Sequence, residues 1–198
     1  MDPSRSRPLC VDMDGTLLES DTMEDLIVAF LRANFWKAPL LLLWLLRGRA
    51  FFKRKLGQVA PLEVNSLVIH DVFVKWLEEQ FRSGRTIVLV SAADESVVRK
   101  VAARFPFFSG AIGSDGKTNL RGDAKARRLT ELYGEKGFDY AGNSHVDYPV
   151  WRDSAESIVV NASPVVERAA REIGNVTQIF PPRPDAPGLL GRLLRRLR

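Results

Sequence analysis

The sequence predicts an α/β protein with a parallel sheet, helices on both faces of that sheet and a helical insertion early in the chain. Three short apolar runs, within residues 9–11, 86–90 and 138–141, are bounded by polar residues, as expected of buried parallel strands. About sixty residues join the first two runs, several times the usual length of a connection. Because that segment shows helical spacing and no strand pattern, it indicates an insertion.

The first apolar run leads into two carboxylates one residue apart, in Leu-Cys-Val-Asp-Met-Asp-Gly-Thr-Leu over residues 9–17. Ligands of open α/β sheets gather at the carboxyl ends of strands, where Asp12 is expected. Side chains alternate along an extended chain, so Asp14 returns to the same face. Gly15 permits a sharp turn over an anion, and Thr16 adds a hydroxyl donor. This arrangement outlines a phosphoryl-transfer site, with Gly15 and Thr16 as substrate-binding residues.

This pattern resembles the first motif of the haloacid dehalogenase (HAD) superfamily of phosphohydrolases. The resemblance implies a Rossmann-like three-layer HAD core with a parallel sheet, and a small helical cap inserted between the first and second motifs. It also implies three further motifs in a fixed order, and all three can be found. One motif alone is a moderate signal, whereas four ordered elements at strand ends or helix starts are specific.

The second and third motifs supply a serine and a lysine. The run at 86–90 ends in Ser91, which in this family would hydrogen-bond a phosphoryl oxygen, and Ala92 follows as a substrate-binding residue. Lys125 precedes apolar residues at helical spacing, and its ammonium would hold the nucleophile and the phosphate together. Lys117 is the alternative lysine, but it follows a turn-like Asp-Gly pair, so we choose Lys125.

The fourth motif departs from the family pattern, because it reads Gly-Asn-Ser-His-Val-Asp over residues 142–147 where the family has GDxxxD. The first acid of that motif is a direct Mg²⁺ ligand in the family, and Asn143 replaces it here. An amide oxygen can coordinate a hard cation, but it brings no charge. The resemblance therefore implies a Mg²⁺ site formed by Asp12, the backbone carbonyl of Asp14, and Asn143 or Asp147.

The resemblance also implies a covalent mechanism. Asp12 would attack phosphorus to form an aspartyl phosphate, while Asp14 protonates the leaving oxygen and later activates water. A dehalogenase of this superfamily lacks the second acid, and a phosphonatase needs a reactive cap lysine, which Lys37, Lys53 or Lys55 supplies only loosely. We therefore predict a phosphatase. The alternative is a catalytically weak HAD module that binds a lipid phosphate or regulates a neighbouring prenyltransferase, because the fourth motif lacks the family's charge.

The expected organisation is a catalytic core of residues 1–21 and 82–180, a helical cap of residues 22–81, and a Pro-rich linker with a basic helix at 181–198. The 198 residues and 45% hydrophobic content suit one compact domain with an insertion. Cys10 is the sole cysteine and is expected to be a small buried hydrophobe, so no disulfide forms within the chain. No apolar stretch follows the N-terminal charges, so we expect no secretory signal and a cytoplasmic protein.

Two segments suggest a membrane surface. Residues 38–46 are apolar on every helix face and are followed by cations, but they are far shorter than the roughly twenty residues that span a bilayer. The alternative, that these leucines pack the inner face of the cap, stays open. Residues 188–198 place leucines on one helix face and arginines on the other, as is typical of a surface anchor. We expect a peripheral protein on the inner face of the cell membrane.

The partners follow from charge and from a closer resemblance. A net charge of +5 does not indicate nucleic acid here, because the arginines come with leucines rather than with base-stacking aromatics. The first motif, the apolar segment and residues 113–120 and 138–144 resemble the HAD domain fused ahead of UbiA-type membrane prenyltransferases. This resemblance implies a phosphorylated small-molecule or isoprenoid substrate and a UbiA-type prenyltransferase as a partner. A free-standing chain and a domain of such a fusion are both allowed.

Overall fold

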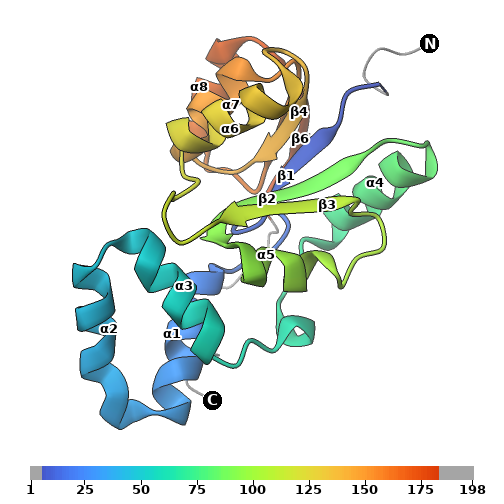
Figure 1. Ribbon diagram of the computed structural model, residues 1–198. Coiled ribbons are helices and arrows are strands. Elements are labelled where there is room, and N and C mark those ends of the chain that lie inside the picture. Colours follow the sequence, from blue (N-terminus) through green and yellow to red (C-terminus); the bar gives the residue numbers. More distant parts are fainter. Residues whose placement is uncertain (1–5, 183–198) are drawn as a thin grey trace.

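The computed structural model describes residues 6–182, and its centre is a sheet of six parallel strands in the order β3-β2-β1-β4-β5-β6 (Figure 1). The strands are β1 (Leu9–Asp12), β2 (Ile87–Asp94), β3 (Gly110–Ser114), β4 (Asp139–Gly142), β5 (Ser157–Val160) and β6 (Val176–Phe180). Every neighbouring pair is parallel, which confirms the predicted α/β fold. The basic helix predicted within 188–198 lies outside the described residues.

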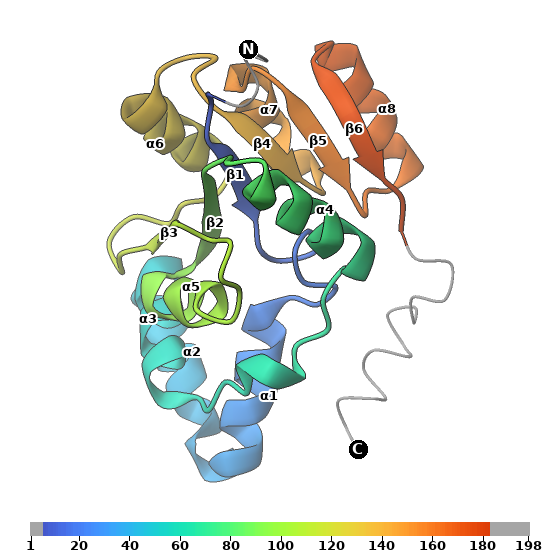
Figure 2. The ribbon, with the colours of Figure 1, turned by 90° about the vertical axis from the view of Figure 1, so that its right-hand side faces the viewer.

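Helices cover both faces of the sheet and complete three layers (Figure 2). One face carries α4 (Asp71–Arg82) and α5 (Glu95–Ala102), and the other carries α6 (Asp123–Tyr133), α7 (Tyr148–Asp153) and α8 (Pro164–Ile173). Strand side chains alternate between these layers, since Leu9 and Val11 join the core on the α4 side and Cys10 joins the core on the α6 side. Burial on both faces explains why the strands read as continuous apolar runs.

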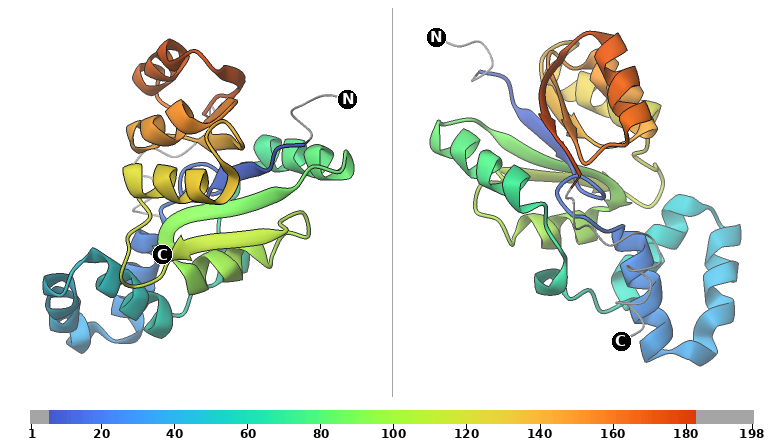
Figure 3. Two further views of the ribbon diagram at one scale, coloured as in Figure 1. Left: turned by 45° about the horizontal axis from the view of Figure 1, so that its top comes forward. Right: turned by 180° about the vertical axis from the view of Figure 1, so that it is seen from behind.

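The insertion that follows β1 consists of three α-helices and two short 3-10 helices, and it lies beyond the carboxyl ends of the strands (Figure 3). They are α1 (Thr22–Ala33), η2 (Phe35–Lys37), α2 (Ala38–Leu46), α3 (Arg49–Val59) and η3 (Val64–Ser66). The first helix begins after Asp21, whose side chain accepts a hydrogen bond from the backbone N–H of Met23 at 2.8 Å. The insertion contacts the core through α3, which packs against β2 and α5.

The fourth helix belongs with the sheet rather than with the insertion. Phe73 of α4 packs on Phe180 of β6 with ring centroids 5.2 Å apart, and Trp76 contacts the same phenylalanine at 5.4 Å. The cap predicted over residues 22–81 includes most of α4, whereas these contacts place α4 beside β6 of the sheet. Hydrophobic spacing predicts a helix, but it does not say which body the apolar face packs on.

One side of α2 packs on the insertion and the other side is exposed. Trp44 contacts Phe30 of α1 with ring centroids 5.5 Å apart, whereas Leu42, Leu43 and Leu46 are exposed, the last at 78%. Packing on the inner face of the insertion therefore accounts for Trp44 but not for Leu42, Leu43 and Leu46. Among the described residues no single helix is long and apolar enough to cross a membrane, and α1 with residues 35–46 qualifies by length and composition only as a pair bent by 116°.

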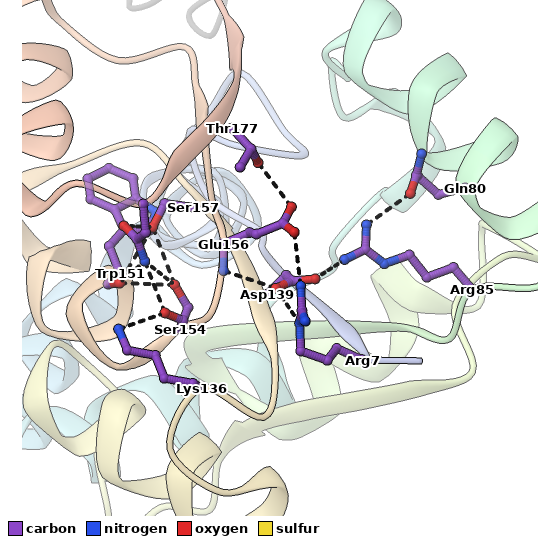
Figure 4. A network of polar contacts seen from close by, with 11 residues as sticks. Arg7, Gln80, Arg85, Lys136, Asp139, Trp151, Ser154, Glu156, Ser157 and Thr177 are labelled. Carbon is purple, nitrogen blue, oxygen red and sulfur yellow. Dashed lines mark hydrogen bonds and ion pairs between the residues drawn. The ribbon is translucent and has the colours of Figure 1, made fainter. Parts of the chain in front are cut away.

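A buried ion network joins the amino ends of the central strands (Figure 4). Asp139, the first residue of β4, is fully buried and accepts hydrogen bonds from Arg7 Nε at 3.0 Å and from Arg85 Nη2. The backbone N–H of Glu156 donates to the same carboxylate at 3.0 Å. These contacts connect the segments that precede β1, β2, β4 and β5. A buried carboxylate needs such partners, because its desolvation is otherwise uncompensated.

We expect Asp139→Ala to lower the free energy of unfolding by about 3–5 kcal/mol, because Arg85 is buried and loses its carboxylate. The matched control is Glu78→Ala, which breaks the exposed Glu78 to Arg82 pair and should cost less than about 1 kcal/mol. Urea unfolding followed by circular dichroism measures both losses. Similar small losses for the two variants would contradict a structural role for the network.

Candidate active site

The strand order places a candidate site where β1 and β4 end. The chain builds β2 and β3 on one side of β1 and then β4, β5 and β6 on the other side. The loops that follow β1 and β4 therefore separate at a topological switch point, which is where open parallel sheets bind ligands. Asp12 is the last residue of β1, and Asn143 directly follows β4.

A tight turn returns the chain after β1 to the sheet edge. The backbone N–H of Leu17 donates to the carbonyl of Asp12 at 3.3 Å. Gly15 has a φ of +77°, and a Cβ atom at this position would collide with the side chain of Asn143. Glycine is required here both by the positive φ and by the close approach of the loop that follows β4.

The ammonium group of Lys125, in the first turn of α6, is the centre of a buried polar cluster. Its Nζ lies 2.6 Å from Asp12 Oδ1, 2.7 Å from the Tyr140 hydroxyl and 3.9 Å from Asp147 Oδ1. The hydroxyl of Tyr140 in turn donates to Asp147 Oδ1 at 2.8 Å. The Lys125 ammonium is thus fixed against the carboxylate of Asp12 by residues of β1, β4, α6 and the loop after β4.

Asp147 uses both carboxylate oxygens to hold the loop after β4. Its Oδ2 accepts hydrogen bonds from the backbone N–H groups of Asn143 and Ser144, at 3.0 Å each, and Oδ1 accepts from Tyr140. Ser144 and Asp147 form a capping box at η4 (His145–Asp147). The sequence predicts Asn143 or Asp147 as a metal ligand, and in the structure both line the cavity, while Asp147 also positions the loop and the Lys125 cluster.

The remaining oxygen donors fit a hard cation of the Mg²⁺ type. No group of three or more histidine, cysteine or acidic side chains within residues 6–182 is arranged to hold a metal. Asp12 and Asn143 nevertheless line the same cavity, and the Asn143 amide makes no hydrogen bond to any described side chain or backbone group. Mg²⁺ in phosphate sites takes one or two protein carboxylates, with waters and substrate oxygens completing its shell. The donor set therefore suits Mg²⁺ with few protein ligands.

Burial raises the pKa of both acids in the first motif. The pKa of Asp14 is raised to about 6 by burial and by the negative charge of Asp21, against hydrogen bonds from Thr22 and Ser91. Burial likewise raises the pKa of Asp12, although the Lys125 ammonium opposes this. A carboxyl with a pKa near 6 can donate a proton close to neutral pH, and an ammonium beside Asp12 favours its nucleophilic, ionised form.

Ser91 lies beside the acids, inside a strand that is longer than predicted. Its Oγ donates to Asp14 Oδ2 at 3.3 Å and accepts from the backbone N–H of Ala93 at 3.0 Å. The sequence predicts that this strand ends at Ser91, whereas β2 continues to Asp94, with a register shift against β3 between Val90 and Asp94. Such irregularities re-aim side chains, and Ser91 and Ala92 both line the cavity.

A cavity of about 400 Å³ lies over these residues, between the core and the insertion. The predicted residues on its wall are Asp12, Asp14, Ser91, Ala92, Lys125, Asn143 and Asp147. The insertion contributes Arg49 and Lys53 from α3, and the loop between β3 and α6 contributes Asn119 and Arg121. The structure thus brings residues of the four predicted motifs to one cavity, whose wall also carries basic side chains.

Two predicted substrate-binding residues do not line this cavity. Gly15 acts in the turn, where its carbonyl accepts a hydrogen bond from Asn161 Nδ2 at 2.9 Å. Thr16 is fully buried, and its hydroxyl has no hydrogen-bond partner among the described residues. Lys117, the alternative to Lys125, also lies away from the wall, in a turn where its backbone N–H donates to Asp115.

Sequence reasoning missed three residues of the site. Tyr140 lies within an apolar strand run and looks like ordinary core, because only the fold places its hydroxyl on Lys125. Arg49 and Arg121 lie in charged segments with no motif around them. The insertion was expected to cover the site, and this expectation is the one observation that could have pointed to Arg49 as a cavity residue.

The chain matches known proteins in sequence. A model of the haloacid dehalogenase-like hydrolase family matches residues 9–152. The uncharacterized protein y4nM of Sinorhizobium fredii (strain NBRC 101917 / NGR234) is 32% identical over 184 residues, which cover 92% of this chain and 35% of y4nM. The chain therefore spans about a third of the length of this curated relative.

Two solved structures show the same fold at low sequence identity. A protein of unknown function from Bordetella pertussis Tohama I has a TM-score of 0.63 and 19% identity, over 88% of this chain and 98% of that one. A phospho-aspartyl intermediate analogue of phosphoserine phosphatase has a TM-score of 0.58 and 15% identity, over 96% of this chain and 98% of that one.

We expect Lys125→Met to destabilise the protein more at pH 8 than at pH 5. Burial already raises the pKa of Asp12, and removing the ammonium raises it further. At pH 5 Asp12 can stay protonated in the folded variant, whereas at pH 8 it must ionise beside Asp147, which lowers the free energy of unfolding. The loss at pH 8 should be about 3–5 kcal/mol. Chemical unfolding at both pH values without divalent cations measures it, with Lys117→Met as the control. An equal loss at both pH values would contradict this electrostatic role.

Proposed function

Because this chain belongs to the haloacid dehalogenase-like hydrolase family, we propose that it hydrolyses phosphomonoesters through an aspartyl-phosphate intermediate. The observation that carries the proposal is the Lys125 ammonium 2.6 Å from Asp12 Oδ1, with Asp14 on the same cavity wall. The similar fold described as a phospho-aspartyl intermediate analogue supports the covalent step.

The first motif performs both halves of the proposed reaction. Asp12 attacks phosphorus, and the bond from phosphorus to the leaving oxygen breaks as the new bond to the carboxylate forms. Protonated Asp14 transfers its proton to the leaving oxygen. The Asp14 carboxylate then takes a proton from water, whose oxygen attacks phosphorus and releases Asp12. Lys125 and Ser91 hold the non-bridging oxygens throughout, and this positioning supplies much of the catalysis in phosphoryl transfer.

The proposed cofactor is Mg²⁺, held by Asp12, the backbone carbonyl of Asp14 and Asn143. When bound, it would offset the negative charge of the phosphoryl group. Asn143 contributes an oxygen without charge, so the protein supplies less negative charge than the family's motif does. This residue is also the observation that favours the second candidate function, a weakly catalytic module that binds a phosphate-bearing lipid.

We also propose that the α2 surface, formed by Phe35, Trp36, Leu42, Leu43 and Leu46, lies in a membrane interface. All five side chains are exposed, and cations flank them in the sequence. Leucine, tryptophan and cations in one exposed segment are typical of interfacial binding. Since α3 follows α2 directly and lines the cavity, a surface-bound protein would hold its active site close to the lipid headgroups.

The proposed substrate is a polyprenyl- or phosphosugar-linked phosphomonoester, and the proposed partner is a UbiA-type membrane prenyltransferase. The α2 surface supports a substrate found at a membrane. The greater length of y4nM supports the occurrence of this domain within larger proteins. Peripheral attachment to the inner face of the cell membrane is part of the same proposal.

Comparison of an aryl with an alkyl phosphate tests the hydrolase. We expect Asp12→Asn to abolish turnover of both para-nitrophenyl phosphate and glycerol 2-phosphate in the presence of Mg²⁺. Asp14→Asn should reduce kcat/KM for the alkyl phosphate by about 10²–10⁴-fold and kcat/KM for the aryl phosphate much less, because kcat/KM reports the step that expels the leaving group and an alkoxide needs the proton more.

The pH profile supplies a second readout of the same experiment. In the wild type, kcat/KM for glycerol 2-phosphate should show an alkaline limb from the loss of the Asp14 proton, whose pKa burial raises to about 6, and Asp14→Asn should lack this limb. Glu78→Gln, at an exposed carboxylate of α4, serves as the control and should keep the wild-type profile. Turnover by Asp12→Asn within tenfold of the wild type would exclude the covalent mechanism.

Vesicle sedimentation tests the membrane proposal. The wild type should bind vesicles of phosphatidylserine and phosphatidylcholine, and a triple Leu42→Ser, Leu43→Ser, Leu46→Ser variant should bind at least about tenfold more weakly, because it loses three of the five exposed apolar side chains of the α2 surface. The matched control replaces three exposed apolar residues elsewhere by serine: Val72, Leu132 and Val165. Thermal unfolding checks that each variant is folded. A wild type that stays in the supernatant at low salt would overturn the proposal.

A further inference from the structure

The cavity wall carries more positive charge than the proposed phosphoryl chemistry uses. Lys125 is paired with Asp12, whereas Arg49, Lys53 and Arg121 line the same cavity without a carboxylate partner among the described residues. The other acids on the wall are engaged elsewhere. Asp21 caps α1, and Asp14 accepts from the backbone N–H of Thr22 at 2.7 Å.

The two arginines lie on different walls of the cavity. Arg49 is the first residue of α3 in the insertion, and Arg121 lies in the loop between β3 and α6 of the core. Neither guanidinium group donates a hydrogen bond or joins an ion pair within residues 6–182, and both side chains are exposed. Their donors are therefore available to a ligand, and no internal ion pair must be broken to use them.

Lys53 fixes the distance between these walls. Its ammonium donates to the carbonyl of Ala92 at 2.6 Å and to Asn119 Oδ1 at 2.9 Å. Lys53 follows Arg49 by four residues, so the two side chains leave the same face of α3. Asn119 in turn accepts a backbone hydrogen bond from Arg121 at 2.8 Å. The hydrogen bond from Lys53 to Asn119 holds α3 against the loop that carries Arg121, and Arg49 and Arg121 line one cavity.

We propose that the substrate is a phosphomonoester with a second anionic group, which Arg49 and Arg121 bind while Asp12 attacks the phosphoryl group. The inference rests on the proposed hydrolase function and names its substrate class. Guanidinium groups bind carboxylates and phosphates in bidentate geometry, which the single ammonium of Lys53, already bonded to two neutral oxygens, does not offer. A volume of about 400 Å³ accommodates such a small organophosphate.

Matched pairs of substrates test this assignment and separate the two sources of the second anion. One pair is 3-phosphoglycerate and glycerol 3-phosphate, which differ in a carboxylate. The other pair is fructose 1,6-bisphosphate and fructose 6-phosphate, which differ in a phosphate. The wild type should prefer the more anionic member of at least one pair by about tenfold or more in kcat/KM, and the preferred pair identifies the anion.

Arginine variants assign the preference to the two walls. Arg49→Gln and Arg121→Gln should each reduce the ratio of kcat/KM within the preferred pair by about tenfold, since each removes one charge-assisted donor. The ratio cancels any effect that is common to both substrates. The matched controls are Arg47→Gln, just before α3, and Arg127→Gln, which lines a different cavity, and both should keep the wild-type ratio.

The outcomes distinguish this inference from the function on which it rests. Suppose the protein hydrolyses para-nitrophenyl phosphate but shows no preference within either pair, or shows a preference that both arginine variants keep. Either result overturns the inference and leaves the hydrolase function in place. Absence of all hydrolysis overturns the hydrolase. Calorimetric titration of the Asp12→Asn variant with 3-phosphoglycerate, glycerol 3-phosphate and the two fructose phosphates then decides the anion site. Tighter binding of the more anionic member, lost on adding Arg49→Gln or Arg121→Gln, supports the site, and equal binding overturns it.

Discussion

The site depends on one buried ion pair, between the Lys125 ammonium and the Asp12 carboxylate. Each charge alone would cost several kcal/mol to bury, so removing either partner lowers the free energy of unfolding. Tyr140 and Asp147 supply the further contacts that a buried ammonium requires. Because the other oxygen of the Asp147 carboxylate accepts hydrogen bonds from the loop after β4, the carboxylate that positions Lys125 also shapes the edge of the cavity. The geometry of the nucleophile and the conformation of this loop are therefore linked.

Much of this arrangement could be predicted from the sequence, because the central strands are buried on both faces. Such strands read as apolar runs bounded by polar residues, and parallel strands bring those polar ends to one edge. The ends of β1 and β4 and the start of α6 were predicted in this way, and the structure brings Asp12, Lys125 and Asn143 to one cavity. The helical pattern after Lys125 and the turn-like Asp-Gly pair before Lys117 supplied the ranking of the two lysines, and of the two only Lys125 contacts Asp12.

The remaining features depend on contacts that periodicity does not encode. Spacing predicted a helix over much of α4, but not that Phe73 packs on β6, because cap helices and core helices have the same period. The prediction of Asp147 as a metal ligand did not anticipate that the loop backbone and Tyr140 occupy both of its oxygens. No pattern in the sequence around Arg49 predicts a binding role, because exposed arginines on basic helices are common. Only the fold shows that Arg49 lines the cavity.

The charge of the cavity connects the altered fourth motif with the insertion. Asn143 removes a negative charge from the floor, while Arg49, Lys53 and Arg121 add positive charge to the walls. A site with this balance relies less on a cation to neutralise its own acids and more on the substrate to neutralise its bases. Under the proposed function, the reacting groups belong to the core, and the groups that select the substrate lie where the core meets α3. The hydrogen bond from Lys53 to Asn119 lies at that junction, so it would align the two sets of groups.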